Sequence, residues 1–309
     1  GLAVVEGEGQ VTVTPPSFRF DLQIDEDLID EVARMIGYQN LPTTPPQAPI
    51  TPRVRPESER SPYAVRRLLA ARGYQETINF SFVEERWECE LAGNPDPIRL
   101  LNPIASQMSV MRSSLIGSLL QVVKFNLDRK ADRVRVFELG RVFLRDPVAR
   151  NTDTTVEGFA QPMRVAGIAY GPVQPLQWDR KAKAADFFDV KADVEALFAP
   201  RNARFESAEH PALHPGRCAR IVLDGRSIGF VGELHPRWRQ AYELPQAPVM
   251  FELDLDAVLA KPVPQARPVP RLQVVERDLA VIVPEAVCHV DVMAAIHAAK
   301  TEGLLRAAV

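Results

Sequence analysis

A proline-rich run near the N-terminal end divides the chain and restricts its fold more than any other feature. The run reads LPTTPPQAPITPRVRP and covers residues 41–56. Because proline lacks an amide hydrogen and has a fixed φ, such a run cannot build a helix or a central strand and is typical of a semi-rigid linker. A second proline-rich run, KPVPQARPVPR, covers residues 261–271. We therefore predict four segments: a small α+β domain over 1–42, a linker over 43–60, a main domain over 61–260, and a linker with a tail over 261–309.

Strand and helix patterns alternate in the main domain. Asp224-Gly225 lies between two runs of alternating apolar residues and predicts a tight two-residue hairpin turn. Apolar spacing and turn residues predict the other elements. The expected helices are Ser61–Gly73, Leu115–Leu127, Phe187–Phe198 and, in the tail, His289–Lys300; the expected strands are Thr77–Phe82, Arg133–Leu144, Arg164–Tyr170, Val249–Leu255 and, in the tail, Val274–Val283. Many strands joined by hairpins, with helices between them, indicate an α+β domain with a mostly antiparallel sheet.

Composition excludes several classes of protein. The 309 residues are 46% hydrophobic and 25% charged, as in an ordinary globular protein. No apolar run approaches the roughly 18 residues of a membrane span, and the start of the chain does not resemble a signal peptide, so we expect a cytoplasmic protein without membrane contact. The 3 cysteines are far apart and form no C-x-x-C pair, which argues against disulfides or a zinc site. We expect buried thiols.

The net charge of -3 gives no general preference for nucleic acid. Any contact with nucleic acid must therefore come from a local basic patch. The richest run extends from Lys124 to Arg145 and includes Arg129, Lys130, Arg133, Arg135 and Arg141. The alternative is that this run forms a solvated helix end and strand face.

Four carboxylates in the small domain stand at spacings that allow them to meet. Asp21 lies near the end of a predicted strand, and Asp27, Asp30 and Glu31 lie on the helix that follows. Residues three and four apart are neighbours on a helix surface, so Asp27 faces both Asp30 and Glu31. Like charges this close repel each other unless they are neutralised, and Mg²⁺ prefers such oxygen ligands. A magnesium site is one reading of these residues.

The other reading is a solvated acidic face. We expect Asp25 to cap the helix N-terminus and Gly37 to end the helix. The helix dipole favours a carboxylate near Asp27, and Arg34 stands one turn beyond Asp30 and Glu31 as a counter-ion. Spacing alone leaves both readings open.

The acidic segment resembles a motif of the bacterial phenylalanyl-tRNA synthetase β subunits. Their pattern is P-S-x-R-x-D followed by E-x-D-L-I-E-E-V-A-R-x-x-G-Y, and this chain reads PSFRFD over residues 16–21 and EDLIDEVARMIGY over residues 26–38. Asp30 departs from the family's glutamate and is one methylene shorter. The resemblance implies that Asp21, Asp27, Asp30 and Glu31 hold Mg²⁺ at a contact with the α subunit.

Further elements extend the resemblance across nearly the whole chain, in the family's order. They are LLAARGYQETINFSF (68–82), NP and MRSSL (102–115), FELGRVF (137–143), HPGR (214–217) and GELHP (232–236). The implied fold is a class II aminoacyl-tRNA synthetase-like antiparallel sheet with flanking helices. The tail from Arg271 to Val309 resembles the start of a ferredoxin-like anticodon-binding domain. We therefore expect a C-terminal fragment that lacks the editing domain and most of the anticodon-binding domain.

The catalytic-like module lacks the expected catalytic groups. A class II site needs one arginine on its second motif, to neutralise the ATP phosphate, and another in a glycine-rich third motif. Leu144 stands where the first arginine is expected, Arg145 would point to the opposite strand face, and no G-x-G-x-x-R follows. We expect no catalytic residues in this chain. His214 and His235, each before a proline, are expected to form structural hydrogen bonds.

The resemblance implies a supporting role in phenylalanine-tRNA ligase. The α subunit would bind ATP and phenylalanine and charge tRNA(Phe), in a heterotetramer of two α and two β subunits. Met108, Val110 and Met111 are expected to be exposed apolar residues that the α subunit covers. The alternative is a free-standing tRNA- or protein-binding module with a synthetase-like fold. An autonomous ligase would need the missing arginine pair.

Overall fold

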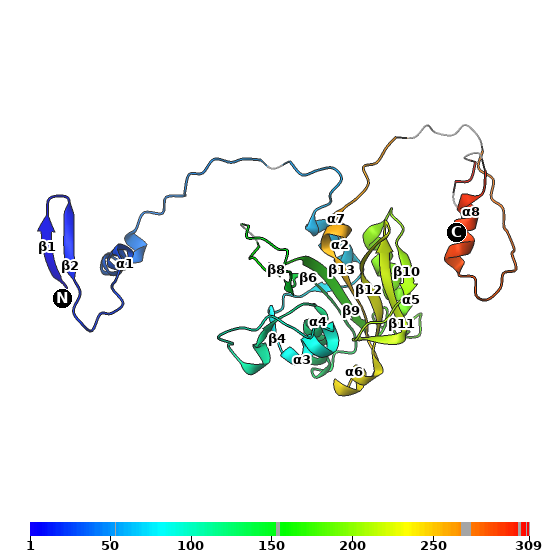
Figure 1. Ribbon diagram of the computed structural model, residues 1–309, viewed down its shortest axis with the longest axis horizontal. Coiled ribbons are helices and arrows are strands. Elements are labelled where there is room, and N and C mark those ends of the chain that lie inside the picture. The colour runs from blue at the N-terminus through cyan, green and yellow to red at the C-terminus, as the bar shows by residue number, and fades with distance from the viewer. Residues whose placement is uncertain (53, 153–154, 267–272, 302–303, 307, 309) are drawn as a thin grey trace. The chain divides into compact units, whose positions relative to one another are not determined.

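The computed structural model divides the chain into two compact units, Gly1–Pro56 and Glu57–Val309 (Figure 1). It describes residues 1–52, 54–152, 155–266, 273–301, 304–306 and 308. Residues 41–52 and 54–56 lie in no helix or strand, as their prolines predict, while residue 53 of the predicted linker lies outside the described residues.

The N-terminal unit contains a hairpin and a helix. Strand β1 (Ala3–Gly7) pairs antiparallel with β2 (Gln10–Thr14), and α1 (Asp25–Ile36) is followed by the short helix η1 (Tyr38–Asn40). The predicted end of α1 at Gly37 is confirmed, because the φ of 89° there suits a residue without a side chain. The predicted cap is wrong: Ile24 is the N-cap residue and Asp25 is the first helical residue. Asp21 lies in a turn and not at the end of a strand.

The described part of the C-terminal unit is built on a seven-stranded sheet with the order β10-β11-β12-β13-β9-β6-β3 (Figure 1). Among these strands, all neighbours are antiparallel except β3 and β6, which are parallel. The strands are β3 (Gln75–Glu76), β6 (Val134–Arg141), β9 (Met163–Tyr170), β10 (Arg204–Ser207), β11 (Leu213–Leu223), β12 (Arg226–Leu234) and β13 (Val249–Asp254).

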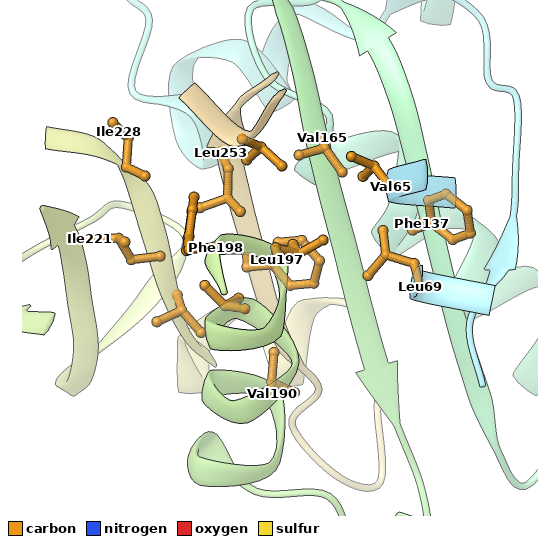
Figure 2. Close-up of a cluster of buried hydrophobic side chains, with 14 of the residues drawn as sticks. Val65, Leu69, Phe137, Val165, Val190, Leu197, Phe198, Ile221, Ile228 and Leu253 are labelled. Atoms are coloured by element: carbon orange, nitrogen blue, oxygen red, sulfur yellow. The ribbon is translucent and has the colours of Figure 1, made fainter. Parts of the chain in front are cut away.

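Helices cover both faces of this sheet. On one face, α2 (Pro62–Ala71), α5 (Phe187–Phe198) and α7 (Leu255–Leu259) pack with Phe251 of β13 into a continuous apolar core (Figure 2). On the other face, α4 (Ile116–Leu127) and α6 (Pro236–Ala241) pack with Met250, the neighbour of Phe251 along the strand. Because successive strand residues point to opposite faces, one strand contributes to both cores. The predicted α+β class is confirmed.

Shorter elements surround the main sheet. Strand β4 (Phe82–Val83) pairs with β5 (Val110–Met111), and β7 (Leu144–Arg145) pairs with β8 (Phe159–Ala160). The short helices α3 (Glu85–Trp87), η2 (Glu88–Ala92) and η3 (Ser106–Met108) lie in the segment between β4 and β5.

Most predicted elements of the main domain are confirmed. Ser61 caps α2, where its Oγ accepts a hydrogen bond from the Tyr63 amide at 3.2 Å. Asp224 and Gly225 have φ values of 51° and 79° and join β11 to β12 in the expected two-residue turn. The predicted strand Arg133–Leu144 is divided between β6 and β7. The predicted strand Thr77–Phe82 is wrong, because β3 ends at Glu76 and β4 begins at Phe82.

The tail contains the predicted helix but not the predicted strand. Helix α8 covers His289–Ala298, whereas residues 274–283, all of them described, lie in no strand. None of the described strands pairs with residues 274–283, so no sheet completes their backbone hydrogen bonds. Arg271, the predicted start of the tail, lies outside the described residues. Of the helices in the described ranges, none has both the length and the apolar character needed to cross a bilayer.

The three cysteines, all of them in the described ranges, are unpaired thiols. Cys218 is buried as predicted, and burial raises the pKa of its thiol to about 11. Cys89 and Cys288 are exposed, so the prediction of buried thiols is wrong for these two residues. Each lies at a short helix or at a helix start, and its side chain reaches neither sheet core.

Candidate functional site

Arg19 joins two of the four acidic residues predicted in the N-terminal unit. Its Nη2 lies 2.8 Å from Oδ2 of Asp21 and 2.6 Å from Oε1 of Glu31. Its Nε also donates to Oδ1 of Asp21 at 3.0 Å. The hydrogen bond from Arg19 lowers the pKa of the Asp21 carboxyl group below its usual value. A guanidinium therefore lies between two carboxylates that come from different parts of the unit.

The other two acidic residues have separate partners. Asp30 accepts a hydrogen bond from the Tyr38 hydroxyl group and forms an ion pair with Arg34 at 2.6 Å, and the bond from Tyr38 is the largest cause of its lowered pKa. Asp27 turns toward the start of α1, where its Oδ2 accepts from the amides of Gln23 at 2.8 Å and Ile24 at 3.0 Å. Asp27 thus satisfies free amides at the helix N-terminus and does not join Asp30 or Glu31.

These contacts involve all four residues of the predicted magnesium site. Four carboxylates are the oxygen donors that a hard divalent cation prefers. Within the described ranges, no group of three or more His, Cys, Asp and Glu side chains is placed to hold a metal. Arg19 and Arg34 supply the positive charge that neutralises Asp21, Asp30 and Glu31.

A second feature lies at the edge of the large sheet, in the extended segment from Thr77 to Ser81. Its apolar side chains face solvent: Ile78 is 93% exposed and Phe80 is 66% exposed. Its polar side chains face the sheet, where Asn79 donates to Oε2 of Glu138 at 2.7 Å. The alternation expected from the sequence is therefore present, but its apolar side points away from the core.

A small ladder adjoins this segment and carries more exposed apolar residues. Strand β5 pairs with β4 on one side, and on the other side the amides of Leu100 and Met111 bond to the carbonyls of Ser109 and Ile98. Leu101 is 99% exposed and Ile104 is 80% exposed in the loop that follows. We use the name apolar edge for Ile78, Phe80, Leu101 and Ile104.

The predicted apolar surface was placed in the correct segment but on the wrong residues. Val110, expected to be exposed, is fully buried, and Met108 and Met111 are half-buried. Val110 belongs to β5 and its side chain is buried. The exposed side chains come from the loop after Leu100 and from residues 78 and 80. The sequence contains no signal for the apolar edge, because the alternation of polar and apolar residues from Thr77 to Phe80 does not show which side faces the sheet.

A buried carboxylate lies on one face of the large sheet. On the face covered by α4, Glu252 is buried and accepts from Oγ of Ser114 at 2.6 Å and from the Leu115 amide at 3.0 Å. Burial raises the pKa of the Glu252 carboxyl group. Leu144 is half-buried on β7, and Arg145 beside it is bound to Asp96 at the surface at 2.9 Å.

The two histidines that precede prolines make the structural hydrogen bonds expected of them. Nδ1 of His214 accepts from the Gly216 amide at 3.0 Å, and Nδ1 of His235 accepts from the Arg237 amide at 3.1 Å. His235 thereby caps α6. Arg217 and Glu233, from the HPGR and GELHP motifs, form an ion pair at 2.6 Å that ties the two motifs together.

The basic run from Lys124 to Arg145 does not form one open surface. Arg135 is buried and forms an ion pair with Asp193. Arg133 donates to the carbonyls of Pro172 and Val173, both at 3.1 Å. Lys124 pairs with Asp128 at 2.9 Å. Arg135 is therefore used inside the protein, whereas Arg129, Lys130, Arg141 and Arg145 are exposed.

Two family models match the chain. The family model described as "Phenylalanyl tRNA synthetase beta chain CLM domain" matches residues 41–255, and the model described as "tRNA synthetase B5 domain" matches residues 1–38. Similar curated proteins include a phenylalanine--tRNA ligase beta subunit of Ralstonia nicotianae, 59% identical over 88% of this chain and 34% of the relative. The corresponding protein of Burkholderia lata is 55% identical over 93% of this chain and 36% of the relative.

The matches cover most of this chain but only part of each relative. A phenylalanine--tRNA ligase beta subunit of Chromobacterium violaceum is 52% identical over 94% of this chain and 36% of its own length. The chain thus spans about a third of the length of the curated relatives it matches. Because one family model covers residues 41–255 and the relatives exceed half identity over nearly the whole chain, the chain belongs to the phenylalanyl-tRNA synthetase β subunit family.

Proposed function

We propose that this chain is a non-catalytic part of phenylalanine-tRNA ligase that supports an α subunit. The α subunit binds ATP and phenylalanine and charges tRNA(Phe) in the cytoplasm, within an assembly of two α and two β subunits. The apolar edge is the observation that carries the proposal, together with the names of the relatives. The proposal includes a class II synthetase-like module over residues 61–260, a small domain over 1–42, a linker over 43–60, and the start of an anticodon-binding domain within 261–309.

The apolar edge has the properties of a protein interface. Ile78, Phe80, Leu101 and Ile104 are each at least 66% exposed. Ile78 and Phe80 lie in the segment that leads into β4, and Leu101 and Ile104 lie in the loop beyond Leu100, which ends a segment bonded to β5. Exposed apolar and aromatic residues that gather in one region mark surfaces that another protein covers. Strand β3, which leads into this segment, lies at one end of the strand order, where a further chain can approach the sheet.

The test of this interface is a matched pair of phenylalanine variants. Phe80 is 66% exposed at the apolar edge, and Phe188 is 73% exposed on α5. In binding measurements with a separately purified α subunit, Phe80→Asp should raise the dissociation constant at least tenfold, because an interface aromatic residue typically contributes 2 kcal/mol or more. Phe188→Asp should leave it unchanged. Equal effects of the two variants, or no binding by the unmodified chain, would favour the free-standing module.

The residue at the expected arginine position supports a chain without its own ligase activity. Glu252 lies buried beside Ser114 at the start of α4, and Leu144 occupies the position expected for the phosphate-binding arginine. The purified chain should therefore not exchange pyrophosphate into ATP in the presence of phenylalanine. Exchange above the background of a heat-denatured sample would contradict this part of the proposal.

The proposal also assigns Mg²⁺, shared with the α subunit, to Asp21, Asp27, Asp30 and Glu31. Their donor chemistry supports the assignment, and the residues are exposed enough to meet a second protein. Since Arg19 already neutralises Asp21 and Glu31, an ion at these residues has to compete with its guanidinium. The chain alone should therefore bind Mg²⁺ weakly.

The magnesium assignment is tested by linkage. If the ion is bound at the contact, it strengthens assembly by the factor by which assembly strengthens ion binding. The dissociation constant of the α–β complex should rise when Mg²⁺ is replaced by a chelator. The double variant Asp27→Asn with Glu31→Gln should lose this dependence, while Asp179→Asn, which alters an exposed carboxylate in the other unit, should keep it. If the dissociation constant of the double variant depends on Mg²⁺ as before, these residues form a solvated acidic face and not a magnesium site.

A further inference from the structure

A buried ion pair lies next to the segment that carries Ile78 and Phe80. Nη2 of Arg112 is 2.8 Å from Oε1 of Glu138, and each side chain is only 3% exposed. Glu138 belongs to β6 of the large sheet, and Arg112 follows β5 of the small ladder. The pair therefore joins the two structures on either side of residues 77–81.

Both partners also reach the segment itself. Oε2 of Glu138 accepts from Nδ2 of Asn79 at 2.7 Å, and Nη1 of Arg112 donates to the Phe80 carbonyl at 3.4 Å. The Arg112 amide donates to the Ser81 carbonyl at 3.0 Å, and the Thr77 amide donates to the Phe137 carbonyl at 2.8 Å. The polar side of residues 77–81 is thus held at both ends and in the middle.

The neighbouring strand leaves room for this arrangement. Gly140 lies two residues beyond Glu138 on β6, and a Cβ atom there would lie 2.4 Å from Nη2 of Arg112 and 2.8 Å from Oε1 of Glu138. Any larger residue would push the ion pair from its place. The guanidinium is further fixed because its Nε donates to the Arg141 carbonyl at 3.1 Å.

Stability alone does not explain such a pair. Removing two charges from water costs several kcal/mol per ion, and well-packed apolar residues of similar volume often stabilise a protein as much or more. Orientation offers an explanation, because a shift of one residue along an extended segment would turn every side chain to the opposite face. A polar anchor for Asn79 prevents that shift, since Ile78 or Phe80 in its place would leave Glu138 with an unfilled hydrogen-bond position.

We propose that Arg112 and Glu138 are positioning residues which, through Asn79, hold Ile78 and Phe80 outward for the partner subunit. The inference rests on the proposed function, because it gives these residues a role in docking. It also makes a statement about the chain alone: the orientation of residues 77–81 depends on the buried pair.

The first experiment removes the hydrogen bond between Asn79 and Glu138 and leaves the ion pair intact. Asn79→Ala deletes the side chain that bonds to Glu138, and the control Asn126→Ala deletes an amide that bonds to the Val122 carbonyl at 2.8 Å in α4. In the complete chain, ¹⁵N heteronuclear NOE values of residues 78–81 should fall in Asn79→Ala and stay unchanged in Asn126→Ala. Binding to the α subunit should weaken at least fivefold in Asn79→Ala alone.

A second variant removes both charges together. Arg112→Met with Glu138→Leu leaves no lone buried charge, so the chain should still fold, as judged by tryptophan fluorescence. It should nevertheless show the same loss of order at residues 78–81. Unchanged NOE values in a folded double variant and in Asn79→Ala would overturn the positioning role.

The two readouts separate this inference from the proposed function. Lost order with unchanged affinity for the α subunit would support positioning in the chain but contradict its role in docking. Retained order, together with a strong effect of Phe80→Asp on affinity, would support the interface and contradict the positioning role.

Discussion

One exposed pair in the N-terminal unit and one buried pair in the C-terminal unit show how differently an arginine and a carboxylate can act. In the N-terminal unit, the side chains of Arg19 and Asp21 are 27% and 53% exposed. In the C-terminal unit, the side chains of Arg112 and Glu138 are both 3% exposed. Exposed pairs are screened by water and salt and contribute little to stability, whereas one partner left alone in a buried pair is strongly destabilising. Exposed pairs can therefore be rearranged by another cation, while buried pairs fix a geometry.

The apolar side chains of one helix in each unit also differ in exposure. Within α1, which the structure describes in full, Ala33 alone is buried, and Ile29, Val32 and Ile36 are more than half exposed. Helix α5 has the same length but buries Val190, Val194, Leu197 and Phe198 (Figure 2). Similar helical periodicity thus accompanies a packed core in one unit and an open apolar face in the other. Periodicity identifies a helix, but not what covers it.

The largest expected effect is in the buried network around Asp193. This carboxylate accepts from Nε of Arg72 at 2.7 Å and from the Tyr74 hydroxyl group at 2.9 Å, and it pairs with buried Arg135. Asp193→Asn should lower the free energy of unfolding by about 3–5 kcal/mol, because Arg135 would lose its counter-ion. Urea unfolding followed by tryptophan fluorescence reports this unit, since Trp87, Trp178 and Trp238 all lie in it. A loss of stability no larger than that caused by removing an exposed pair would show that buried and exposed pairs contribute alike in this chain.

The next largest effect compares a buried position on α5 with an exposed position on α1. Leu197 on α5 is fully buried, and Leu197→Ala should cost about 3 kcal/mol through lost apolar contact and the cavity left behind. Ile29 on α1 is 66% exposed, and Ile29→Ala should change stability by less than about 0.5 kcal/mol. Urea unfolding measures the first variant, and amide hydrogen exchange of residues 25–36 measures the second. A large loss of protection in Ile29→Ala would show that the face of α1 is already covered in the free chain.

A pH effect of intermediate size should come from His210. Its ring lies 4.0 Å from that of Phe230, and burial lowers its pKa from 6.5 to about 4. Because the folded state disfavours the charged form, this contribution to stability is complete above pH 6.5 and is lost as pH falls toward 4. By linkage the loss at pH 4.5 is about 2 kcal/mol.

The measurement for His210 is the free energy of unfolding at pH 7 and at pH 4.5. His210→Phe keeps a ring against Phe230 but cannot take up a proton, so its stability should fall less over this range than that of the unmodified chain. Equal slopes for the two proteins would contradict the assignment. An NMR titration of the His210 ring should independently place its pKa below 5.

The smallest effect should be that of Asp21→Asn. The pKa of Asp21 is lowered by Arg19, so the contribution of this pair is present above the unfolded pKa and is lost as pH falls through the folded pKa. Because the pair is exposed, amide exchange of α1 at pH 7 should be nearly the same in the variant and in the unmodified chain. Raising the salt concentration should remove any remaining difference. A pronounced loss of protection would show that this pair resembles the buried ones.

The sequence allowed the prediction of local structure with a clear chemical cause. Ser61-Pro62 marked the start of α2 and Asp224-Gly225 marked the hairpin, because each satisfies a local backbone requirement. The orientation of residues 77–81 could not be predicted, since alternation does not show which side faces the core. That choice depends on Glu138, which lies 59 residues from Asn79 in the chain.

The candidate sites could be located from the sequence, but not their internal arrangement. The acidic residues were identified by spacing and resemblance, yet Arg19 reaches Glu31 across 12 residues through an irregular segment. The spacing of acidic residues in a sequence does not show whether an arginine or a metal ion binds their oxygens. The magnesium assignment remains a proposal for the same reason.

The apolar edge has a consequence for how such a chain is produced in a cell. In the proposed assembly, Ile78, Phe80, Leu101 and Ile104 lie in water until the α subunit covers them. Copies made in excess of the partner present a surface that pairs with other edges and attracts chaperones and proteases. Synthesis of the two subunits in equal numbers, and near each other, would keep this surface hidden soon after folding. The abundance of the chain would then be set by the supply of its partner.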